Sequence, residues 1–414
     1  MTSDAILPPR HAAFAFVMVT VFLDMLAIGI IMPVLPRLVV DFAGGDIVGG
    51  AVWLGVFGTA WALMQFIFSP VQGSLSDRFG RRPLIIGSNI GLGLDYILMA
   101  LAPNLWWLFI GRLISGITAA SFSTAFAYVA DVTTPDQRAK KMGLLGVAFG
   151  SGFVIGPVLG GLTGAVDPRL PFWIAAGLSL TNAVYGFFVL PESLPSERRS
   201  PFVWRRANPL GSLTLVRRSR SLFGLTLVNF LGQVSHCVLP AVSVLYLGYR
   251  YGWDERLIGL AIGSVGVGHM IVQGTLIGPM VKHFGERGTL MIGLAFGVAG
   301  FVVMGLAESG FVFWLSIPLM SVWGISNAAS QALMTRQVGP DEQGQLQGAN
   351  MSAAGIANMI GPLAFAQTFA LSIGLLAGLR LPGLAFLVAA AMLAASAIIA
   401  WRTTQPAIRP AAES

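Results

Sequence analysis

Long apolar stretches separated by short polar segments dominate the chain. A helix needs about 20 predominantly apolar residues to cross a bilayer. Twelve stretches approach or exceed that length, at 14–36, 50–72, 83–102, 105–130, 142–165, 170–190, 221–247, 257–281, 289–308, 310–335, 347–372 and 380–401. The pattern therefore predicts an all-α membrane protein with twelve transmembrane helices.

The sequence also repeats itself. Several turn and loop positions match at a constant offset of 205: Gly73 with Gly278, Phe79 with Phe284, Gly80 with Gly285, Asp131 with Arg336, and Gly156-Pro157 with Gly361-Pro362. The longest polar segment divides the spans into six and six. We predict an N-terminal six-helix bundle at 1–190, a cytoplasmic linker at 191–220, and a C-terminal six-helix bundle with a short tail at 221–414. Such repeats are typical of secondary transporters, whose substrate sites lie at the repeat interface near the membrane midplane.

Composition supports a membrane location. The chain is 55% hydrophobic and 10% charged, whereas soluble domains carry about 25% charged residues. Of the Lys and Arg residues, 19 lie on the side of the N-terminus, 5 lie on the opposite side, and Arg112 lies within a span. The positive-inside rule therefore predicts a multi-pass protein of the cell inner membrane with both termini in the cytoplasm.

The same distribution argues against a nucleic-acid partner, because the basic residues that give the net charge of +7 occupy short loops between apolar runs. The single cysteine, Cys237, excludes an internal disulfide and a CxxC site. The sequence has no P-loop, metal-ligand cluster or nucleophile motif. We expect no enzymatic activity, cofactor or metal, and we expect a monomer in the bilayer whose partners are protons and a small molecule.

The loop between the second and third spans has an unusual sequence, GSLSDRFGRRP at 73–83. Gly73 is expected to allow close helix approach and Gly80 a tight turn. Asp77 can face the positive N-terminal end of a helix in the other half, because a helix dipole attracts a carboxylate there. We assign a conformational latch between the halves to this loop and to the loop after the fourth span. Its residues are Gly73, Asp77, Arg78, Gly80, Arg81 and Asp131.

This loop resembles the signature between the second and third helices of the major facilitator superfamily. The segments at 23–36, 93–100, 111–120 and 344–348 resemble the tetracycline-exporter branch, and GSGFVIGPVLGG at 150–161 resembles the signature of drug/proton antiporters. The resemblance implies the fold of two pseudo-symmetric six-helix bundles and proton-coupled export. Gly152, Gly156 and Gly160 share one helix face, which favours close packing. The resemblance implies that this face meets the eighth span, and Pro157 is expected to kink its helix.

Five ionisable residues lie within predicted spans: Asp24, Asp95, Arg112, His236 and His269. Each is a candidate functional group, because charge inside a bilayer is costly. The resemblance implies that Asp24 and Arg112 take part in proton coupling, and that Asp95 binds substrate or a proton. Purely structural roles are the alternative: an Asp24–Arg112 pair, and a hydrogen-bonded, protonated Asp95.

Other polar residues complete the predicted substrate site. Gln273 lies one helical turn after His269, and tetracycline exporters have a histidine and a glutamine in this arrangement. His236 and Gln65 are further candidates, although satisfied interior side chains would look the same in the sequence.

The chain departs from the tetracycline exporters in the ninth span, where Gly297 occupies the position of their essential acid. This departure weighs against tetracycline itself as the substrate. We predict a proton-coupled antiporter that exports an amphipathic drug or metabolite. The alternative is a proton-coupled uptake carrier for a small solute, and a membrane enzyme or receptor has no supporting motif.

Overall fold

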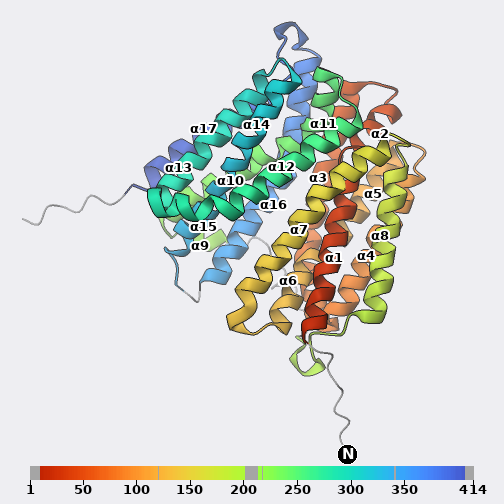
Figure 1. Ribbon diagram of the computed structural model, residues 1–414, viewed down its shortest axis with the longest axis vertical. Helices are drawn as coiled ribbons and strands as arrows, with labels where there is room; N and C mark the ends of the chain where they lie inside the picture. Colours follow the sequence, from red (N-terminus) through yellow and green to blue (C-terminus); the bar gives the residue numbers. More distant parts are fainter. Residues whose placement is uncertain (1–9, 120, 201–212, 217, 340–341, 406–414) are drawn as a thin grey trace, which may run out of the picture. The chain divides into compact units, whose positions relative to one another are not determined.

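The computed structural model describes residues 10–119, 121–200, 213–216, 218–339 and 342–405, so most of the predicted linker and both ends of the chain lie outside the described residues. Regular structure in the described residues is helical throughout (Figure 1). The helices are α1 (Arg10–Ile31), α2 (Leu35–Phe42), α3 (Ile47–Phe79), α4 (Arg81–Ala100), α5 (Leu105–Thr118), α6 (Ser121–Val132), α7 (Pro135–Gly164), α8 (Leu170–Val189), α9 (Leu213–Val216), α10 (Arg220–His236), α11 (Val238–Tyr251), α12 (Glu255–Thr275), α13 (Ile277–Leu306), α14 (Gly310–Trp323), α15 (Ile325–Thr335), α16 (Gln343–Ile373) and α17 (Leu384–Thr403), with 3-10 turns at Ser196–Arg198 and Ala377–Leu379. The predicted all-α fold is confirmed.

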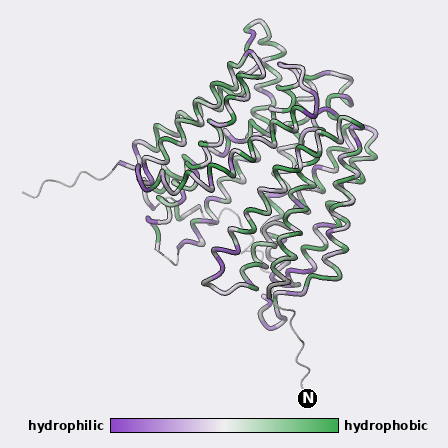
Figure 2. The backbone as a smooth tube through the Cα atoms, in the orientation of Figure 1, coloured by the Kyte–Doolittle hydropathy of each residue, from purple (hydrophilic) through white to green (hydrophobic). Residues whose placement is uncertain are grey.

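Eleven segments of the described chain are long and apolar enough to cross a bilayer, and Figure 2 shows that these helices are hydrophobic over most of their length. Each corresponds to one predicted span, although the predicted span 257–281 ends too late, because α12 ends at Thr275 and α13 begins at Ile277. The remaining predicted span, 105–130, is divided into α5 and α6, and α5 alone has only 14 residues. The last span begins at Leu384 rather than at 380, because Arg380 has a left-handed backbone with φ of 52° and Pro382 follows it.

Two breaks interrupt helices of the second half. The first separates α10 from α11 at Cys237. Pro240 lies four residues after His236 and has no N–H to donate to that residue's carbonyl, which explains why the hydrogen-bonded ladder stops there. The second break separates α14 from α15 at Gly324. Non-helical backbone at membrane depth is tolerated where protein or a cavity surrounds it.

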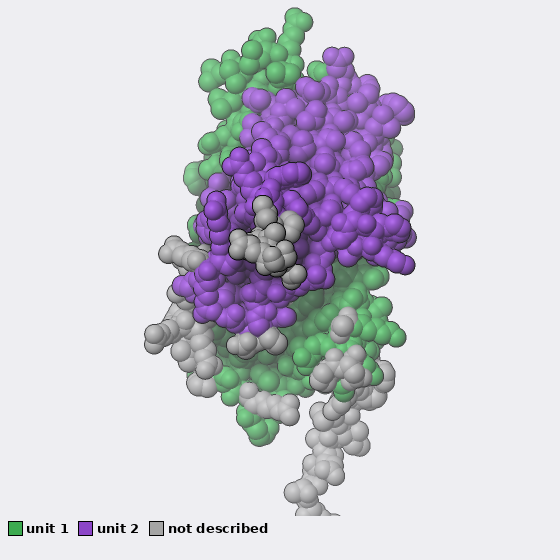
Figure 3. Space-filling model, turned by 90° about the vertical axis from the view of Figure 1, so that its left-hand side faces the viewer, with its two compact units in different colours: residues 1–209, 239–267, 362–382 green, residues 210–238, 268–361, 383–414 purple. Residues whose placement is uncertain are grey.

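The chain forms two compact units that are not continuous in sequence (Figure 3). Unit 1 comprises residues 1–209, 239–267 and 362–382, and unit 2 comprises residues 210–238, 268–361 and 383–414. In unit 1, α1 packs on α7 and α8, and α4 packs on α5 and α8. In unit 2, α13 packs on α14, α15 and α17. The division into bundles at 1–190 and 221–414 stays a prediction.

The internal repeat is visible in the backbone. Gly80 and Gly285, at equivalent positions, have φ of 107° and 66°. Residues that carry a side chain rarely adopt positive φ angles, so glycine is required at both turns. Pro157 lies inside α7, and its counterpart Pro362 lies inside α16. The shared backbone features support duplication of one helical unit.

Candidate functional site

Unit 1 contains two buried carboxylates at mid-helix positions. Asp24 on α1 is 3% exposed and Asp95 on α4 is 1% exposed. The Asn182 amide on α8 donates a hydrogen bond of 3.1 Å to Oδ1 of Asp24 and one of 3.3 Å to the carbonyl of Thr20. This anchoring follows from the packing of α1 on α8.

Arg112 on α5 makes its ion pair with Asp95, at 3.8 Å. The sequence suggested Asp24 as the partner of Arg112, so this contact differs from the expectation. The physical reason is that α4 packs directly on α5. Arg112 also donates a hydrogen bond of 3.3 Å to the sulfur of Met99. Both carboxylate oxygens of Asp95 are buried without a hydrogen-bond donor in the described structure, so the pair is held by charge across 3.8 Å rather than by direct hydrogen bonds.

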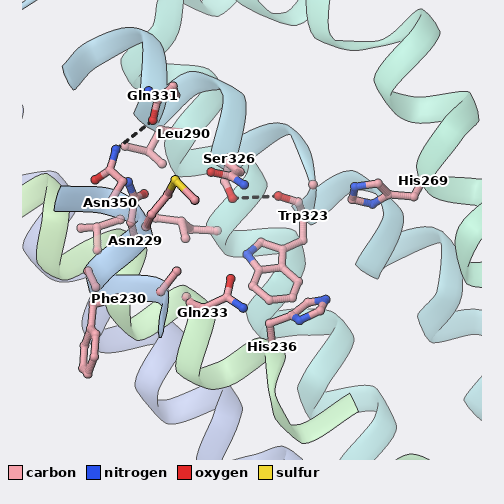
Figure 4. Close-up of a pocket in the computed structure, with 18 of the residues that line it drawn as sticks. Asn229, Phe230, Gln233, His236, His269, Leu290, Trp323, Ser326, Gln331 and Asn350 are labelled. Carbon is pink, nitrogen blue, oxygen red and sulfur yellow. Dashed lines mark hydrogen bonds between the residues drawn. The ribbon is translucent and has the colours of Figure 1, made fainter. Parts of the chain in front are cut away.

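Unit 2 contains a pocket of about 390 Å³ (Figure 4), which lies within the size range of small-molecule sites. It is lined by residues of α10, α12, α13, α14, α15 and α16. His236, His269 and Gln273, three of the predicted substrate residues, line it together. Gln65, a fourth candidate, lies half-buried on α3 in unit 1 and does not line this pocket.

The two helix breaks supply much of the pocket wall. His236 is the last residue of α10, and Trp323 is the last residue of α14. Their rings lie 6.0 Å apart, and Figure 4 shows them side by side. His269 packs against the second break, since a Cβ at Gly324 would lie 2.8 Å from its Nδ1. Gln273 and the Nε2 atom of His269 are hydrogen-bonded at 2.7 Å, which confirms that they share a helix face.

Five further amide side chains line the pocket and were not predicted: Asn229, Gln233, Asn327, Gln331 and Asn350. Asn229 accepts a hydrogen bond of 2.7 Å from Ser330 Oγ, and Gln233 donates one of 2.9 Å to Asn358. The sequence contained a signal for two of these residues, because Asn229 and Gln233 lie one helical turn apart within an apolar span.

Arg81 is the centre of the predicted latch. It contacts Asp77 at 2.5 Å and Asp131 at 3.1 Å, and it donates a hydrogen bond of 2.5 Å to Ser76 Oγ. The carboxylate of Asp77 therefore meets a side chain of its own loop in unit 1, whereas the sequence suggested a helix end in the other half. Arg78 lies over the Phe79 ring at 5.1 Å. These contacts bring the loop after α3 together with the end of α6.

Glu192 is a residue of this region that the sequence did not suggest. Its carboxylate accepts hydrogen bonds of 2.8 Å from the Arg81 N–H and 3.3 Å from the Arg82 N–H, at the start of α4. A carboxylate is stabilising at a helix N-terminus. The close helix approach expected at Gly73 is not present, because a Cβ there would meet nothing within 4 Å.

The glycine face of α7 packs on α1. A Cβ at Gly152 would lie 2.6 Å from the carbonyl oxygen of Phe22, and one at Gly156 would lie 2.7 Å from the Cα of Gly29. Gly160 likewise faces the backbone of Ile30. The face of Gly152, Gly156 and Gly160 thus serves the first span, not the eighth as the sequence suggested.

The contact between α7 and α12 exists on a different face. A Cβ at Gly161 would lie 3.2 Å from the Cα of Gly259, and one at Gly263 would lie 2.6 Å from a methyl of Val158. Small residues on both helices let the backbones approach closely. Gly259 and Gly263, four residues apart, were the sequence signal for this contact.

The chain matches the family model of the Major Facilitator Superfamily over residues 17–362 and 222–413. It is 39% identical over 383 residues to "Tetracycline resistance protein, class C" of Escherichia coli, covering 92% of this chain and 94% of that protein. It is 35% identical over 349 residues to the class E protein of Escherichia coli, covering 84% and 86%.

Two solved structures share the fold. The human organic anion transporter MFSD10 (TETRAN) has a TM-score of 0.70 at 24% identity, with 95% of this chain and 100% of that chain covered. The nucleoside transporter NupG has a TM-score of 0.76 at 11% identity, with 95% and 99% covered. At these identities the likeness concerns the fold.

Proposed function

Because the chain belongs to the major facilitator superfamily, and is a multi-pass membrane transporter and not an enzyme, we propose that it exports an amphipathic drug or metabolite from the cell in exchange for protons. The relatives named tetracycline resistance proteins support export of a drug. We place the protein in the cell inner membrane as a monomer, with both termini in the cytoplasm, because its basic loops lie on that side.

The observation that carries the proton part of this proposal is the pair of buried carboxylates in unit 1. Asp24 and Asp95 lie within α1 and α4, at 3% and 1% exposure. Ionisable groups within membrane-spanning helices mark ion or proton pathways. Arg112, at 3.8 Å from Asp95, supplies a fixed positive charge against which a proton can be exchanged. We assign proton coupling to these three residues.

The substrate part rests on the pocket in unit 2. Its polar lining of imidazole and amide groups, within walls that include Phe230, Trp323 and Leu290, suits a ligand that is partly apolar and partly polar. We assign substrate binding to His236, His269 and Gln273 of this pocket, and we keep Asp95 and Gln65 as substrate-binding candidates within unit 1.

The experiment uses everted membrane vesicles in which respiration acidifies the interior. Tetracycline, named for the relatives, is the first compound to add, followed by compounds chosen from a susceptibility panel in an efflux-deficient host. An antiporter releases protons from the vesicle when its substrate enters. We expect this release with the wild-type protein and its loss in Asp24→Asn, which cannot ionise.

The matched control is Asp46→Asn. Asp46 is exposed and caps α3 by accepting a hydrogen bond of 2.9 Å from the Val48 N–H, a role that asparagine also performs. This variant should release protons like the wild type. Accumulation of a solute together with protons in intact cells would instead identify the uptake carrier. Unchanged coupling of Asp24→Asn in the vesicles would remove the proton role of Asp24.

A further inference from the structure

We propose that Asn182 on α8 is a positioning residue for proton exchange. It directs the proton to Oδ2 of Asp24, and it weakens proton binding there by stabilising the ionised carboxylate. This inference rests on the proposed function, because it concerns the proton site assigned to Asp24. The carboxylate and the amide lie on α1 and α8, two helices that pack against each other within unit 1 (Figure 1).

The orientation of the Asn182 amide follows from its two partners. Nδ2 lies 3.3 Å from the carbonyl oxygen of Thr20 and 3.1 Å from Oδ1 of Asp24. A backbone carbonyl only accepts hydrogen bonds, so the part of the amide that faces it must be the NH2 group. Rotation of the amide by half a turn would place its oxygen against both acceptors. The NH2 group therefore donates one hydrogen to the backbone of α1 and one to the carboxylate.

This arrangement makes the two oxygens of Asp24 unequal. Oδ1 accepts the hydrogen bond from Asn182, and an oxygen that gains a proton becomes a weaker acceptor. A proton on Oδ2 leaves the bond from Asn182 intact, so Oδ2 is the preferred site of protonation. The hydrogen bond thus holds the carboxyl group in one orientation in both its ionised and its protonated state.

The same hydrogen bond changes the proton affinity of Asp24. A hydrogen bond to an ionised acceptor is stronger than one to a neutral acceptor, so the donor favours the carboxylate over the carboxylic acid. Its effect is large in a buried site, and Asn182 and Asp24 are only 1% and 3% exposed. Without the donor, burial favours the protonated form. Asn182 therefore assists release of the proton to the cytoplasm.

Ionisable groups of α4 and α5 also lie in this part of unit 1, since Tyr96 interacts electrostatically with Asp24, Asp95 and Arg112. On the other helices that pack on α1, the described ionisable side chains of α6, α7 and α8 lie toward the predicted cytoplasmic ends: Tyr128, Asp131, Arg138, Lys140, Lys141 and Tyr185. Substitution of the uncharged Asn182 alters none of these groups. The titration of Asp24 can therefore be compared at constant surrounding charge.

The first test measures protonation of Asp24 directly, without substrate and without a proton gradient. The full-length protein is purified in lipid nanodiscs, and infrared spectroscopy follows the C=O stretch of protonated carboxyl groups from about pH 4 to about pH 10. The signal of Asp24 is the one that is absent from Asp24→Asn. Asn182→Leu keeps a similar size and removes the donor. We expect it to raise the midpoint of this signal by about one pH unit, a tenfold gain in proton affinity.

Two further variants separate the hydrogen bond from packing. Asn182→Ala also removes the donor, so the midpoint should rise in this variant too, and it takes the place of Asn182→Leu if the leucine variant does not fold. Ser179→Ala is the matched control. Ser179 lies one turn before Asn182 on α8 and is 2% exposed, and loss of its hydroxyl should leave the midpoint of Asp24 unchanged.

The second test measures proton release from everted vesicles at several external pH values. Release is driven by tetracycline, or by whichever panel compound drives it in the wild type. The external medium stands for the cytoplasm, where the carboxyl group must lose its proton. The external pH of half-maximal release should therefore rise by about one unit in Asn182→Leu. A purely structural role of Asn182 would instead lower the release at every pH without moving the profile.

The inference is overturned when the midpoint of Asp24 stays the same or falls in the donor-free variants, shown to be folded by their melting temperatures. It is equally overturned when Ser179→Ala shifts the midpoint as much, when no carboxyl signal between about pH 4 and about pH 10 depends on Asp24, or when the pH profile of release does not move.

The two tests also separate this inference from the proposed function. The expected infrared shift in a protein whose wild type releases no protons would refute the proposed function alone. Proton release by the wild type, with an unchanged midpoint of Asp24 in Asn182→Leu, would refute this inference alone.

Discussion

At the scale of single residues, the partner of Arg112 decides how the buried charges of unit 1 balance. Arg112 lies 3.8 Å from Asp95 and its side chain is 15% exposed, whereas the Asp95 side chain is fully buried. Removing one member of a buried ion pair costs about 3 kcal/mol or more, because the other charge stays in a low-dielectric interior. We expect Arg112→Met to lower the free energy of unfolding by about that amount, measured by thermal unfolding in detergent.

The double variants identify the partner. Asp95→Asn combined with Arg112→Met should recover most of the loss, because no uncompensated charge remains. Asp24→Asn combined with Arg112→Met should recover little, since Asp24 is anchored by Asn182 on a different helix. Recovery with Asp24→Asn instead would mean that the pair suggested by the sequence is the one that stabilises the protein.

The sequence could identify these three residues but not their pairing. A charge within an apolar run is conspicuous because it is costly there, so Asp24, Asp95 and Arg112 were evident. Which carboxylate meets the guanidinium depends on the rotation and packing of α4 against α5, and spacing along the chain does not contain that information. The amides Gln331 and Asn350 were not predicted, because an uncharged amide within an apolar run is less costly than a charge and therefore less conspicuous.

At the scale of helices, the duplicated unit keeps an ion pair and reverses its charges. In the first half Arg81, at the start of α4, contacts Asp131 at 3.1 Å. The positions 205 residues later hold Glu286 and Arg336, which contact one another at 2.6 Å. The pair therefore joins equivalent elements of both halves with the opposite sign, which supports a structural task at this point in each repeat.

The two pairs should differ in strength. The Arg81 side chain is 12% exposed and has three acceptors, Asp77, Asp131 and Ser76. The Arg336 side chain is 74% exposed. We expect Arg81→Met to cost about 2–3 kcal/mol and Arg336→Met about 0.5 kcal/mol, compared by thermal unfolding at equal salt. Equal costs for the two variants would show that exposure does not control the strength of this pair.

Apolar length and turn residues were enough to predict the spans and the repeat. The breaks at Cys237 and Gly324 were not predicted, because the hydropathy of a broken span equals that of a continuous one. Gly297 illustrates the same limit. The sequence shows that residue 297 is a glycine and not the acid of the tetracycline exporters. It does not show that the indole of Trp323, on another helix, fills the space beside this glycine.

At the scale of the whole molecule, unit 1 joins segments from both halves of the sequence. Arg37 on α2 forms an ion pair with Glu255 at the start of α12. A Cβ at Gly58 on α3 would lie 2.8 Å from the Pro362 side chain of α16. Arg37 belongs to the side with few basic residues, so the ion pair lies on the predicted outer side. Alternating access requires that these contacts separate once in each transport cycle.

A reversible crosslink tests this requirement. In a Cys237→Ser background, cysteines replace Arg37 and Glu255. A bis-methanethiosulfonate reagent joins them through two disulfides, each formed with release of methanesulfinate and each cleaved by a reductant. A reagent with a spacer is chosen because it does not require the Cα separation of about 7 Å or less that a direct disulfide needs. We expect crosslinking to stop substrate-driven proton release, and cleavage to restore it. Each single-cysteine variant, treated with the same reagent, should keep its activity. Full proton release from the crosslinked double variant would show that the contacts between α2 and α12 need not open for transport.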